Sequence, residues 1–444
     1  MSAPLSNPMT SKGGTAPLCN PMTSKGGTAP LCNPMTSKGG TAPLCNPPLR
    51  VAVDARPLDI PYLRSQGIGR YAHGLLGPLA EVAAERGGQL VLLREPTSGP
   101  AAFAQPGGDP EPTSALPGAP TLRLRRPQLP PRLADWPEHL LLPIDLRRTR
   151  AQLLHALSIY RTAVRPGLPS VMTMHDVIPL MWPDEYMRTG LKYRVLYAAA
   201  RRARLLLAVS EASRRDILDH LDVDPGRVLT VHEAADARFA PADPRGVRER
   251  LGLKGPYVLY VGGLSSPDPR KNAAGLIDAF ERWRVAGGRE ETLVLAGELS
   301  GPGEELRANA QRAGARVLFA GFAPDEELPA LYSGASCFVT ASRYEGFGLP
   351  ALEAISCATP VAAFDAGAVP EVAGPGALLA PPGDLASLMG AVGRICDEPE
   401  LRRRLANQGR EHARRFSWRR TAELTWAAYE QAARGGAKGD AAPL

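Results

Sequence analysis

The chain of 444 residues has little of what secreted and membrane proteins need. No run of about 18 apolar residues is present to span a membrane, and Met1–Asn7 has neither the basic start nor the apolar core of a secretory signal. Of the six cysteines, three belong to a short repeat, and Cys337, Cys357 and Cys396 lie in apolar or helical stretches. No disulfide framework is expected, and a reducing cytosol fits best. We therefore expect a cytoplasmic protein.

Metal-ligand spacing and familiar nucleophile motifs are also missing. The seven histidines are scattered without the spacing of a metal site. Asp222 and Asp224 have the spacing of an acidic metal motif, but Pro225 and Gly226 follow them and no nucleotide loop surrounds them. Neither a Gly-x-Ser-x-Gly elbow nor a Walker phosphate loop occurs. We expect no metal and no bound cofactor.

Basic and turn-forming residues, in contrast, are plentiful. The formal net charge is +7 and the pI about 9.2. Such a charge favours anionic partners such as nucleotide phosphates, anionic lipids or nucleic acid, without choosing among them. Proline and glycine number 45 each, well above ordinary usage. Much of this excess lies in residues 1–50 and 95–131, which we expect to be poorly ordered. The 44% of apolar residues suffices for two α/β cores.

A repeated unit, Asn-Pro-Met-Thr-Ser-Lys-Gly-Gly-Thr-Ala-Pro-Leu-Cys, occurs at 7–19, 20–32 and 33–45. Its prolines and glycines, and the lack of a periodic apolar face, argue against helix and sheet. The unit is either a low-complexity tether, or the product of a translated DNA repeat or of a start codon placed too early. Residues 1–48 are therefore expected to be disordered and to lie outside the fold.

The rest of the chain alternates short apolar strands with helices, which indicates a doubly wound parallel sheet in each half. In the first half, strands are expected at 49–53, 89–93, 170–174, 205–209 and 227–231. In the second half, strands at 257–261, 292–296, 316–320 and 337–340 alternate with helices at 272–284, 303–313, 325–334 and 350–357, and helices at 384–396, 398–415 and 417–433 follow. The expected domains are 49–235, a linker at 236–254, 255–415, and a C-terminal helix and tail at 416–444.

The segment from Glu345 to Glu353 carries the most specific chemistry. A strand ends near Thr340, a glycine loop follows, and Pro350 stands where a helix should begin. Such a loop offers unpaired amides and the positive end of a helix dipole to an anion such as a diphosphate. The two glutamates would then flank the anion and accept hydrogen bonds from hydroxyl groups on either side of it. The alternative is a solvated loop carboxylate and a satisfied helix carboxylate.

Together with 357–361 and 367–372, this segment resembles the signature of the family 4 retaining glycosyltransferases, and the resemblance spans roughly residues 50–433. It implies the GT-B fold, an α/β architecture of two Rossmann-like domains that face a cleft, with a C-terminal helix that crosses back. It implies that Glu345 contacts the donor sugar and that Glu353 holds the donor ribose. The phosphates would meet the loop backbone, made up of Gly346, Phe347, Gly348 and Leu349.

Two cations precede the helix expected at 272–284. Arg270 and Lys271 can neutralise charge that develops on a leaving diphosphate, and the resemblance assigns this role to Lys271. Many family members carry an arginine where this chain has Gly263, and Arg270 is the candidate to compensate. The alternative for both cations is a solvated loop end.

His175 follows the strand expected at 170–174, at the carboxyl end where such sheets place ligands. The resemblance implies that it hydrogen-bonds to the donor sugar or stabilises the transition state, and the alternative is a structural histidine. Asp176 is expected to orient the loop. Ser210 is interpreted mainly as a helix N-cap.

Two further glycine-containing segments match the family. Gly67, Gly69 and Arg70 resemble the first-domain loop that faces the diphosphate and the acceptor. Arg70 is either a cleft cation or a surface arginine. Gly321 and Phe322 match the loop that cups the nucleotide base, largely through its backbone.

The helix expected at 191–204 mixes basic residues with aromatic ones. Lys192, Arg194 and Arg201 accompany Tyr193 and Tyr197. This combination suits an anionic membrane surface. The alternative is an ordinary amphipathic helix that covers the sheet.

The sequence therefore predicts a metal-independent hexosyltransferase of polysaccharide biosynthesis. It would move a sugar, with retention, from a nucleotide-sugar donor on the second domain to a saccharide or lipid-linked acceptor on the first. An anionic membrane surface at the inner face is a further expected partner, and nucleic acid is not. The alternatives are a GT-B epimerase or phosphorylase, and a non-catalytic sugar-nucleotide- or lipid-binding protein. The joint presence of Glu345, Glu353, Lys271 and His175 argues against the non-catalytic alternative.

Overall fold

The computed structural model describes residues 48–60, 67–95, 119–124, 126–127, 136–186, 191–264 and 268–435. Residues 1–47 and 48–444 separate into two units. The repeat at 7–45 lies outside the described residues, and of the segment 1–48, predicted to be disordered, only Pro48 lies within them. Most of the proline-rich segment 95–131 also lies outside them, although its described part contains a short strand.

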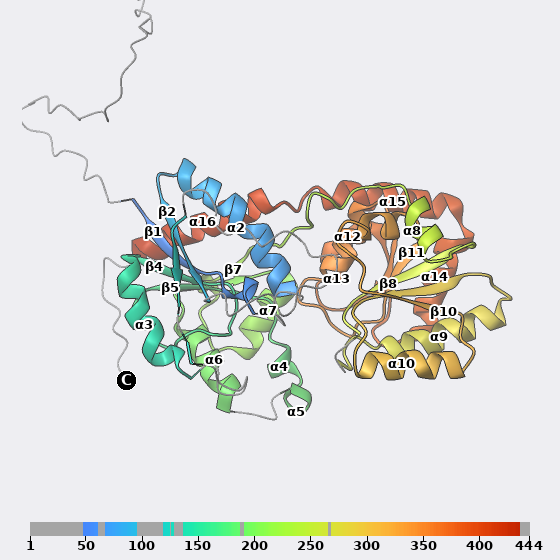
Figure 1. Cartoon of the computed structure of the whole chain (residues 1–444), viewed down its shortest axis with the longest axis horizontal. Helices are drawn as coiled ribbons and strands as arrows, with labels where there is room; N and C mark the ends of the chain where they lie inside the picture. The colour runs from blue at the N-terminus through green and yellow to red at the C-terminus, as the bar shows by residue number, and fades with distance from the viewer. Residues whose placement is uncertain are drawn as a thin grey trace, which may run out of the picture. The chain divides into compact units, whose positions relative to one another are not determined.

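Within the described residues, the first sheet has seven parallel strands in the order β3-β2-β1-β4-β5-β6-β7 (Figure 1). They are β1 (Arg50–Asp54), β2 (Gln89–Arg94), β3 (Thr121–Arg123), β4 (Leu153–Ala156), β5 (Ser170–Met174), β6 (Leu205–Ala208) and β7 (Val228–Thr230). The five predicted strands are confirmed, while β3 and β4 were not predicted. The central strands are buried on both faces, which explains their nearly continuous apolar runs.

Helices cover both faces of this sheet. They are η1 (Arg56–Leu58), α2 (Gly67–Glu85), α3 (Glu138–Thr149), α4 (Ile178–Met181), α5 (Pro183–Tyr186), α6 (Leu191–Arg202), α7 (Glu211–His220) and η2 (Pro225–Arg227). Side chains alternate across a strand, so Val51 and Val53 of β1 pack in the core with α2, while Ala52 packs on the other face with α3.

The second sheet has six parallel strands among the described residues, in the order β10-β9-β8-β11-β12-β13. They are β8 (Tyr257–Val261), β9 (Thr292–Ala296), β10 (Val317–Gly321), β11 (Cys337–Thr340), β12 (Val361–Phe364) and β13 (Ala377–Ala380). Its helices are α9 (Ala273–Ala286), α10 (Pro302–Arg312), α11 (Leu328–Ser333), α12 (Leu349–Ser356), α13 (Val369–Ala373), η3 (Gly374–Gly376), α14 (Leu385–Asp397) and α15 (Pro399–Ala413). The four predicted strands are confirmed, and β12 and β13 extend the sheet beyond them.

The segment 236–254, predicted as a linker, contains a short helix, α8 (Arg245–Arg250). The predicted helix at 325–334 is shorter than expected, because α11 begins only at Leu328. The described residues contain no helix whose length and apolar character would let it cross a membrane.

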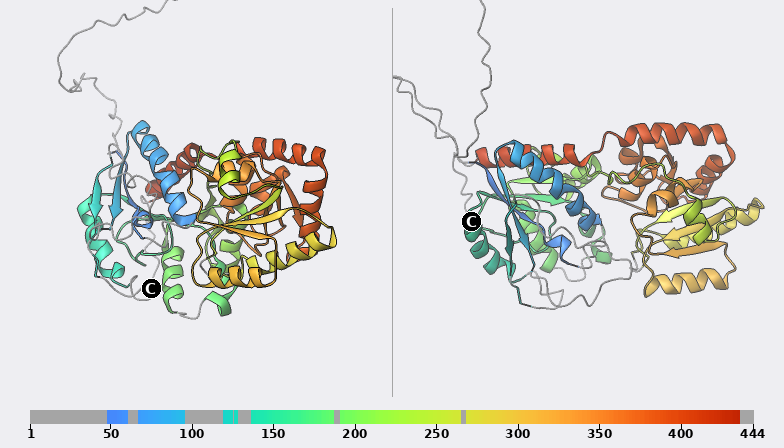
Figure 2. Two further views of the ribbon diagram at one scale, coloured as in Figure 1. Left: turned by 45° about the vertical axis from the view of Figure 1, so that its right-hand side comes forward. Right: turned by 45° about the horizontal axis from the view of Figure 1, so that its top comes forward.

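The last helix, α16 (Trp418–Arg434), packs against α2 on the first sheet, as Figures 1 and 2 show. Two tryptophans occupy the space that side chains at glycines would need. A Cβ atom at Gly74 would lie 2.1 Å from the Trp418 ring, and one at Gly88 would lie 2.3 Å from the Trp426 ring. Trp426 is 2% exposed. The predicted C-terminal helix that crosses back to the first half of the chain is therefore confirmed.

Candidate active site

The first side of the candidate site lies where strands β5 and β7 end. His175 follows β5, and its Nδ1 lies 2.9 Å from Oε1 of Glu233, which follows β7. Its Nε2 lies 3.0 Å from the carbonyl oxygen of Leu157. Burial alone would lower the pKa of His175, but the hydrogen bond and charge of Glu233 raise it. Both partners are acceptors, so the ring is arranged to donate from both nitrogens as an imidazolium.

Both ring nitrogens of His175 are thus bound to protein acceptors in this structure. A hydrogen bond from this ring to a sugar would require one of these two contacts to open. Glu233 is a site residue that the sequence analysis missed, although its position just after an apolar strand was a usable signal. The next residue after His175, Asp176, accepts a hydrogen bond of 3.0 Å from the amide of Ile178 at the start of α4.

Two serines at the start of α7 hold the glycine loop of the second half. Ser210 caps α7 by accepting a hydrogen bond of 2.9 Å from the amide of Ser213, as predicted. Its hydroxyl donates to the carbonyl oxygen of Gly346 at 2.6 Å, and the hydroxyl of Ser213 donates to the same oxygen at 2.9 Å. Glycine at 346 is required, because a Cβ atom there would lie 2.1 Å from the carbonyl oxygen of His175. The loop therefore lies directly against the end of β5.

The glycine loop ends at a helix start, as the sequence predicted. Gly348, at φ 91°, is the N-cap of α12, and Pro350 lies in its first turn. Phe347 and Leu349 are buried. A helix start of this kind offers its first amides and the positive end of its dipole to an anion.

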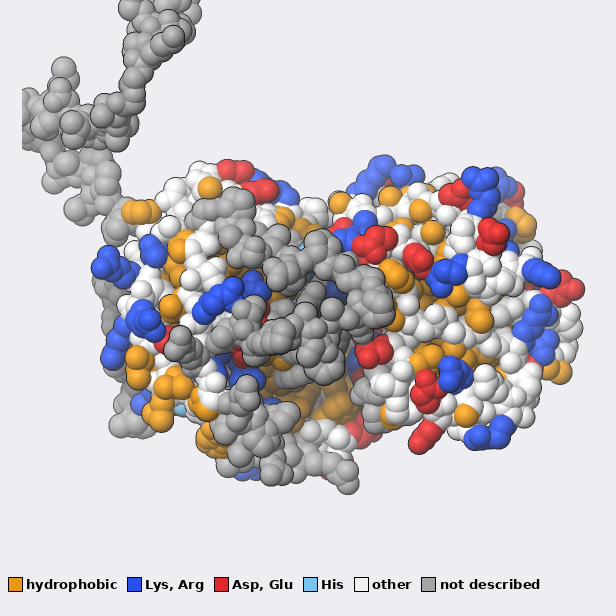
Figure 3. All heavy atoms as spheres, in the orientation of Figure 1, with side chains coloured by type: hydrophobic (Ala, Val, Ile, Leu, Met, Phe, Trp, Pro, Cys, Tyr) orange, Lys and Arg blue, Asp and Glu red, His pale blue; other side chains and the backbone are white. Residues whose placement is uncertain are grey.

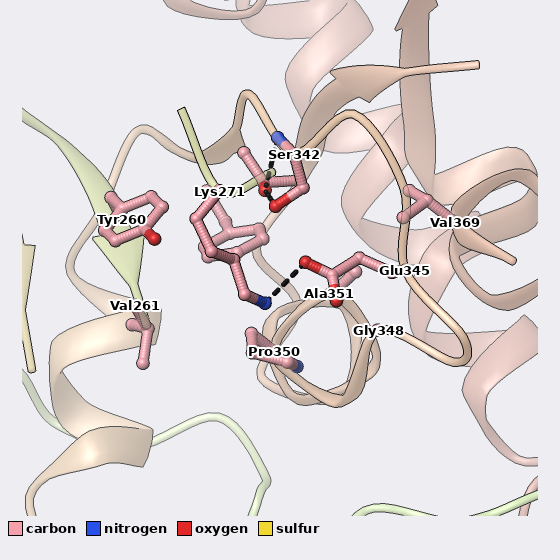
Figure 4. Close-up of a pocket in the computed structure, with 11 residues that line it drawn as sticks. Tyr260, Val261, Lys271, Ser342, Glu345, Gly348, Pro350, Ala351 and Val369 are labelled. Atoms are coloured by element: carbon pink, nitrogen blue, oxygen red, sulfur yellow. Dashed lines mark hydrogen bonds and ion pairs between the residues drawn. The ribbon is translucent and has the colours of Figure 1, made fainter. Parts of the chain in front are cut away.

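Glu345 lies in front of this helix start and is bound by two cations, Arg270 and Lys271, of which Figure 4 shows Lys271. Its Oε1 lies 2.6 Å from Nζ of Lys271, and its Oε2 lies 2.9 Å from a guanidinium nitrogen of Arg270. Burial would raise the pKa of Glu345, but the charges of Lys271 and Arg270 outweigh it and lower the pKa to about 2. The structure therefore brings together three side chains that the sequence assigned to the donor site.

Arg270 is held by more than Glu345. It also donates to the carbonyl oxygen of Tyr344 at 2.7 Å and to Oδ2 of Asp268 at 2.9 Å. The other carboxylate oxygen of Asp268 accepts a hydrogen bond of 2.6 Å from the hydroxyl of Tyr186 in α5. These bonds fix the guanidinium beside Glu345, so Arg270 is built to orient that carboxylate. Asp268 and Tyr186 were not predicted, because no local motif marks either of them.

At Gly263 the structure leaves the space of a side chain open. A Cβ atom there would meet no atom within 4 Å in the part of the chain that is described. The predicted compensation by Arg270 for a missing cation at this position stays a prediction. In the structure the guanidinium of Arg270 is bound to Asp268, Tyr344 and Glu345.

Glu353, one helical turn into α12, is 2% exposed. Its Oε2 accepts a hydrogen bond of 2.9 Å from the hydroxyl of Tyr332, and its Oε1 lies 2.5 Å from a guanidinium nitrogen of Arg70. Burial raises the pKa of Glu353, and the charge of Arg70 opposes this rise. Arg70 also binds Asp325 at 2.8 Å. It is thus placed against the carboxylate of the second half rather than on open surface.

A cavity of about 160 Å³ lies beside this pair. Its lining includes Gly69, Arg70, Leu349 and Glu353. Gly67 and Gly69 belong to the first turn of α2, since this helix begins at Gly67. The cavity therefore joins the predicted loop of the first half to the predicted ribose carboxylate of the second.

The two residues predicted to cup the nucleotide base, Gly321 and Phe322, are among the predicted residues that do not line this cavity. Gly321 has a φ of 70° and ends β10, and Phe322 after it is 61% exposed.

Among the described residues, no group of three His, Cys, Asp or Glu side chains is arranged to hold a metal ion.

Two family models match the chain: glycosyl transferases group 1 over residues 247–412 and glycosyltransferase family 4 over residues 66–239. The O-antigen chain mannosyltransferase B of Escherichia coli is 31% identical over 271 residues, which are 59% of this chain and 70% of that protein. The MMP alpha-(1->4)-mannosyltransferase of Mycolicibacterium hassiacum is 38% identical over 282 residues, 60% of this chain and 66% of that protein. The structure of HepE from Anabaena in complex with UDP-glucose matches with a TM-score of 0.63 at 20% identity, over 87% of this chain and 99% of that one.

Two parallel sheets of the Rossmann type, with charged residues gathered at their strand ends and helix starts, define a glycosyltransferase of the GT-B fold. The chain belongs to the group 1 glycosyltransferases of family 4, and it is a glycosyltransferase enzyme. The family resemblance drawn from the segment between Glu345 and Glu353 is confirmed.

Proposed function

We propose that this glycosyltransferase moves a hexose from a nucleotide-sugar donor, held by the second half of the chain, to a saccharide or lipid-linked acceptor held by the first. The observation that carries the proposal is the cluster of Glu345, Lys271 and Arg270 in front of the start of α12. A diphosphate at this helix start would meet amide groups, a helix dipole and an ammonium group together.

In this proposal, donor binding exchanges partners within the cluster. The diphosphate takes the ammonium group of Lys271, and the freed oxygen of Glu345 accepts a hydrogen bond from a hydroxyl of the sugar. Arg270 keeps the other oxygen in place, because Asp268 and Tyr344 hold its guanidinium independently of the donor. A ribose hydroxyl would displace Arg70 from Glu353 in the same way.

We further propose that the anomeric configuration is retained and that no metal is required. Lys271, Arg70 and the imidazolium of His175 supply positive charge for a leaving diphosphate. With the donor bound, Arg270 occupies one oxygen of Glu345 and a sugar hydroxyl the other, which makes this carboxylate a poor nucleophile. We therefore favour attack of the acceptor from the side of the leaving group, with the departing phosphate as the base.

The sugar and the location are also proposals. Two relatives are named mannosyltransferases, which makes mannose the first sugar to test. HepE, whose structure contains UDP-glucose, makes glucose the second. Cys337, Cys357 and Cys396 carry free thiols, which favours a reducing, cytoplasmic compartment.

The test is a panel of nucleoside diphosphate sugars, with release of the nucleoside diphosphate measured with and without saccharide and lipid-linked acceptors. Acceptor-dependent release is expected, and NMR of the product's anomeric proton checks retention. Added EDTA should leave the rate unchanged. Glu353→Ala should abolish donor binding, and donor conversion without an acceptor would indicate an epimerase instead.

A further inference from the structure

Helix α3 of the first half carries apolar side chains on two sides. Leu142 and Leu146 are buried in the core beneath the first sheet. Trp136, just before the helix, and Leu140 and Ile144 within it are 44%, 75% and 55% exposed. Spaced four residues apart, these three side chains follow one another along the outer side of the helix. Such a second apolar side is expected to be covered by something.

This concentration is unusual within the described part of the chain. Of the six large hydrophobic side chains exposed there, three belong to this one line. The others lie apart from one another: Val285 on α9, Phe322 just after β10 and Leu379 on β13. Figure 3 shows hydrophobic side chains next to Lys and Arg side chains at the lower left, in the region of α3. The apolar line is thus a localised feature of the surface.

The charges beside the line are positive. Arg147, Arg148 and Arg150 follow Ile144 at the end of α3 and are exposed. Arg148 lies 3.5 Å from Asp145 but remains 66% exposed. The acidic residues of α3 face inward, since Glu138 is fully buried and Asp145 is 15% exposed.

Those two carboxylates are bound to buried arginines. Glu138 binds Arg56 at 2.6 Å and Arg126 at 2.8 Å, and Asp145 binds Arg126 at 2.8 Å. These pairs neutralise the inner side of α3, so the outer side presents apolar and cationic groups together.

In α6, the helix predicted to meet a membrane, the apolar side chains are buried instead of exposed. Its Leu196 and Tyr197 are each 1% exposed and pack in the core with Met172 of β5 and Leu206 of β6. The apolar side of α6 therefore covers the sheet, which is the alternative that the sequence left open.

We propose that α3 docks onto a membrane whose surface carries anionic lipid headgroups. The docking surface consists of Trp136, Leu140, Ile144, Arg147, Arg148 and Arg150. At the boundary between headgroups and acyl chains, apolar side chains and the tryptophan ring leave water while guanidinium groups stay among phosphates. A protein partner would need its own apolar strip beside an acidic one, whereas an anionic bilayer offers both over its whole area.

The position of α3 suits a membrane-bound acceptor. Glu138, at the start of α3, binds Arg56, which lies just after the carboxyl end of β1. In a parallel sheet, this is the same edge as the one at which His175 follows β5. The start of a docked α3, with Trp136, therefore brings lipid next to the proposed acceptor edge, while the arginines at its end lie towards the opposite edge, just before β4. This consequence rests on the proposed function, but the docking itself does not.

The experiment is co-sedimentation of the full chain with vesicles, without any nucleotide sugar. Vesicles of phosphatidylcholine with phosphatidylglycerol are compared with vesicles of phosphatidylcholine alone. Binding is expected with the anionic vesicles and should weaken as salt is raised. The pairs Leu140→Glu with Ile144→Glu, and Arg147→Glu with Arg148→Glu, should each lower the vesicle affinity by at least about tenfold. All four side chains are exposed, so the fold should tolerate the changes.

The matched control is Val285→Glu on α9, which places the same charge at an apolar residue that is 63% exposed. It should bind vesicles like the unaltered protein. The proposal is overturned if the unaltered protein fails to bind, if Leu140→Glu with Ile144→Glu binds equally well, or if vesicles without anionic lipid bind as strongly. A lipid-free dimer that the same pair of substitutions dissociates would also overturn it, because the surface would then join two copies of the chain. Circular dichroism melting checks that each variant is folded.

Discussion

Replacing Lys271 by methionine tests the charge cluster at the centre of the site. The substitution keeps a side chain that extends to the Cε position and removes the ammonium group that lies 2.6 Å from Glu345. Two effects are expected, one on stability and one on turnover. They are measured separately, the first by denaturation and the second by enzyme assay.

The effect on stability follows from the pKa of Glu345. The ordinary pKa is 4.5 and the pKa in the fold is about 2, so the carboxylate is stabilised relative to the unfolded chain. This difference corresponds to roughly 3 kcal/mol of stability at pH 7. A lowered pKa gives stability that is present above pH 4.5 and is lost as the pH falls toward 2. At about pH 3, roughly 1 kcal/mol of it should remain.

Because Arg270 remains, Lys271→Met should remove only part of this contribution, roughly 1–2 kcal/mol at pH 7 and less at pH 3. Urea denaturation at the two pH values measures the difference. Lys254→Met is the matched control, because Lys254 is exposed. Turnover should fall on the order of a hundredfold if Lys271 stabilises the leaving diphosphate. A loss of stability as large at pH 3 as at pH 7 would refute the electrostatic explanation, and unchanged turnover would refute the catalytic one.

Three further predictions concern other parts of the molecule. Tyr186→Phe removes the hydroxyl that orients Asp268 and, through it, Arg270. We expect kcat to fall about fivefold with little change in donor KM. An unchanged kcat would show that Tyr186 does not position Arg270. Arg56→Met leaves the buried carboxylate of Asp54 without its cation and should cost about 3–5 kcal/mol in urea denaturation; a cost below about 1 kcal/mol would contradict the burial argument. Deleting residues 1–48 should leave transfer and melting temperature unchanged, and a lost activity would show that the repeat is functional.

The elements of the second half were predictable because their signals are local. Strands β8, β9 and β11 are short runs of β-branched and apolar residues. The start of α12 is indicated by Gly348 and, two residues later, Pro350. Strand β4 was missed because it has only four residues and contains a histidine. His155 is fully buried, and it is accepted there because Tyr429 and Thr173 bind its two ring nitrogens. Both of these partners are remote in the sequence.

Helix α3 was missed for a different reason. It contains Pro143 inside its length, and its apolar residues occupy two sides instead of one stripe. The periodicity that marks an amphipathic helix is therefore lost.

In the candidate site too, residues with a local sequence signal were predictable, and residues that depend on contacts between remote segments were not. Glu345 and Glu353 stand in one local segment, Lys271 directly precedes a predicted helix, and His175 directly follows a predicted strand, so the sequence singles them out. Their partners depend on sheet order and on the approach of separate elements. Glu233 reaches His175 because β7 lies beside β6 and β6 beside β5. Tyr186 reaches Asp268 from the other half of the chain, and a pattern in one sequence does not report such a contact.

The contact between Arg70 and Glu353 has a consequence for selectivity. The carboxylate of Glu353 and the guanidinium of Arg70 are bound to each other, and Glu353 is almost fully buried. A phosphate alone can bind Arg70, but the buried carboxylate of Glu353 then loses one partner. A sugar alone can donate hydrogen bonds to Glu353, but the guanidinium of Arg70 then loses one partner. A molecule with both a hydroxyl group and an anionic group satisfies the two at once. Under the proposed function, we therefore expect the ion pair to favour whole nucleotides over their fragments.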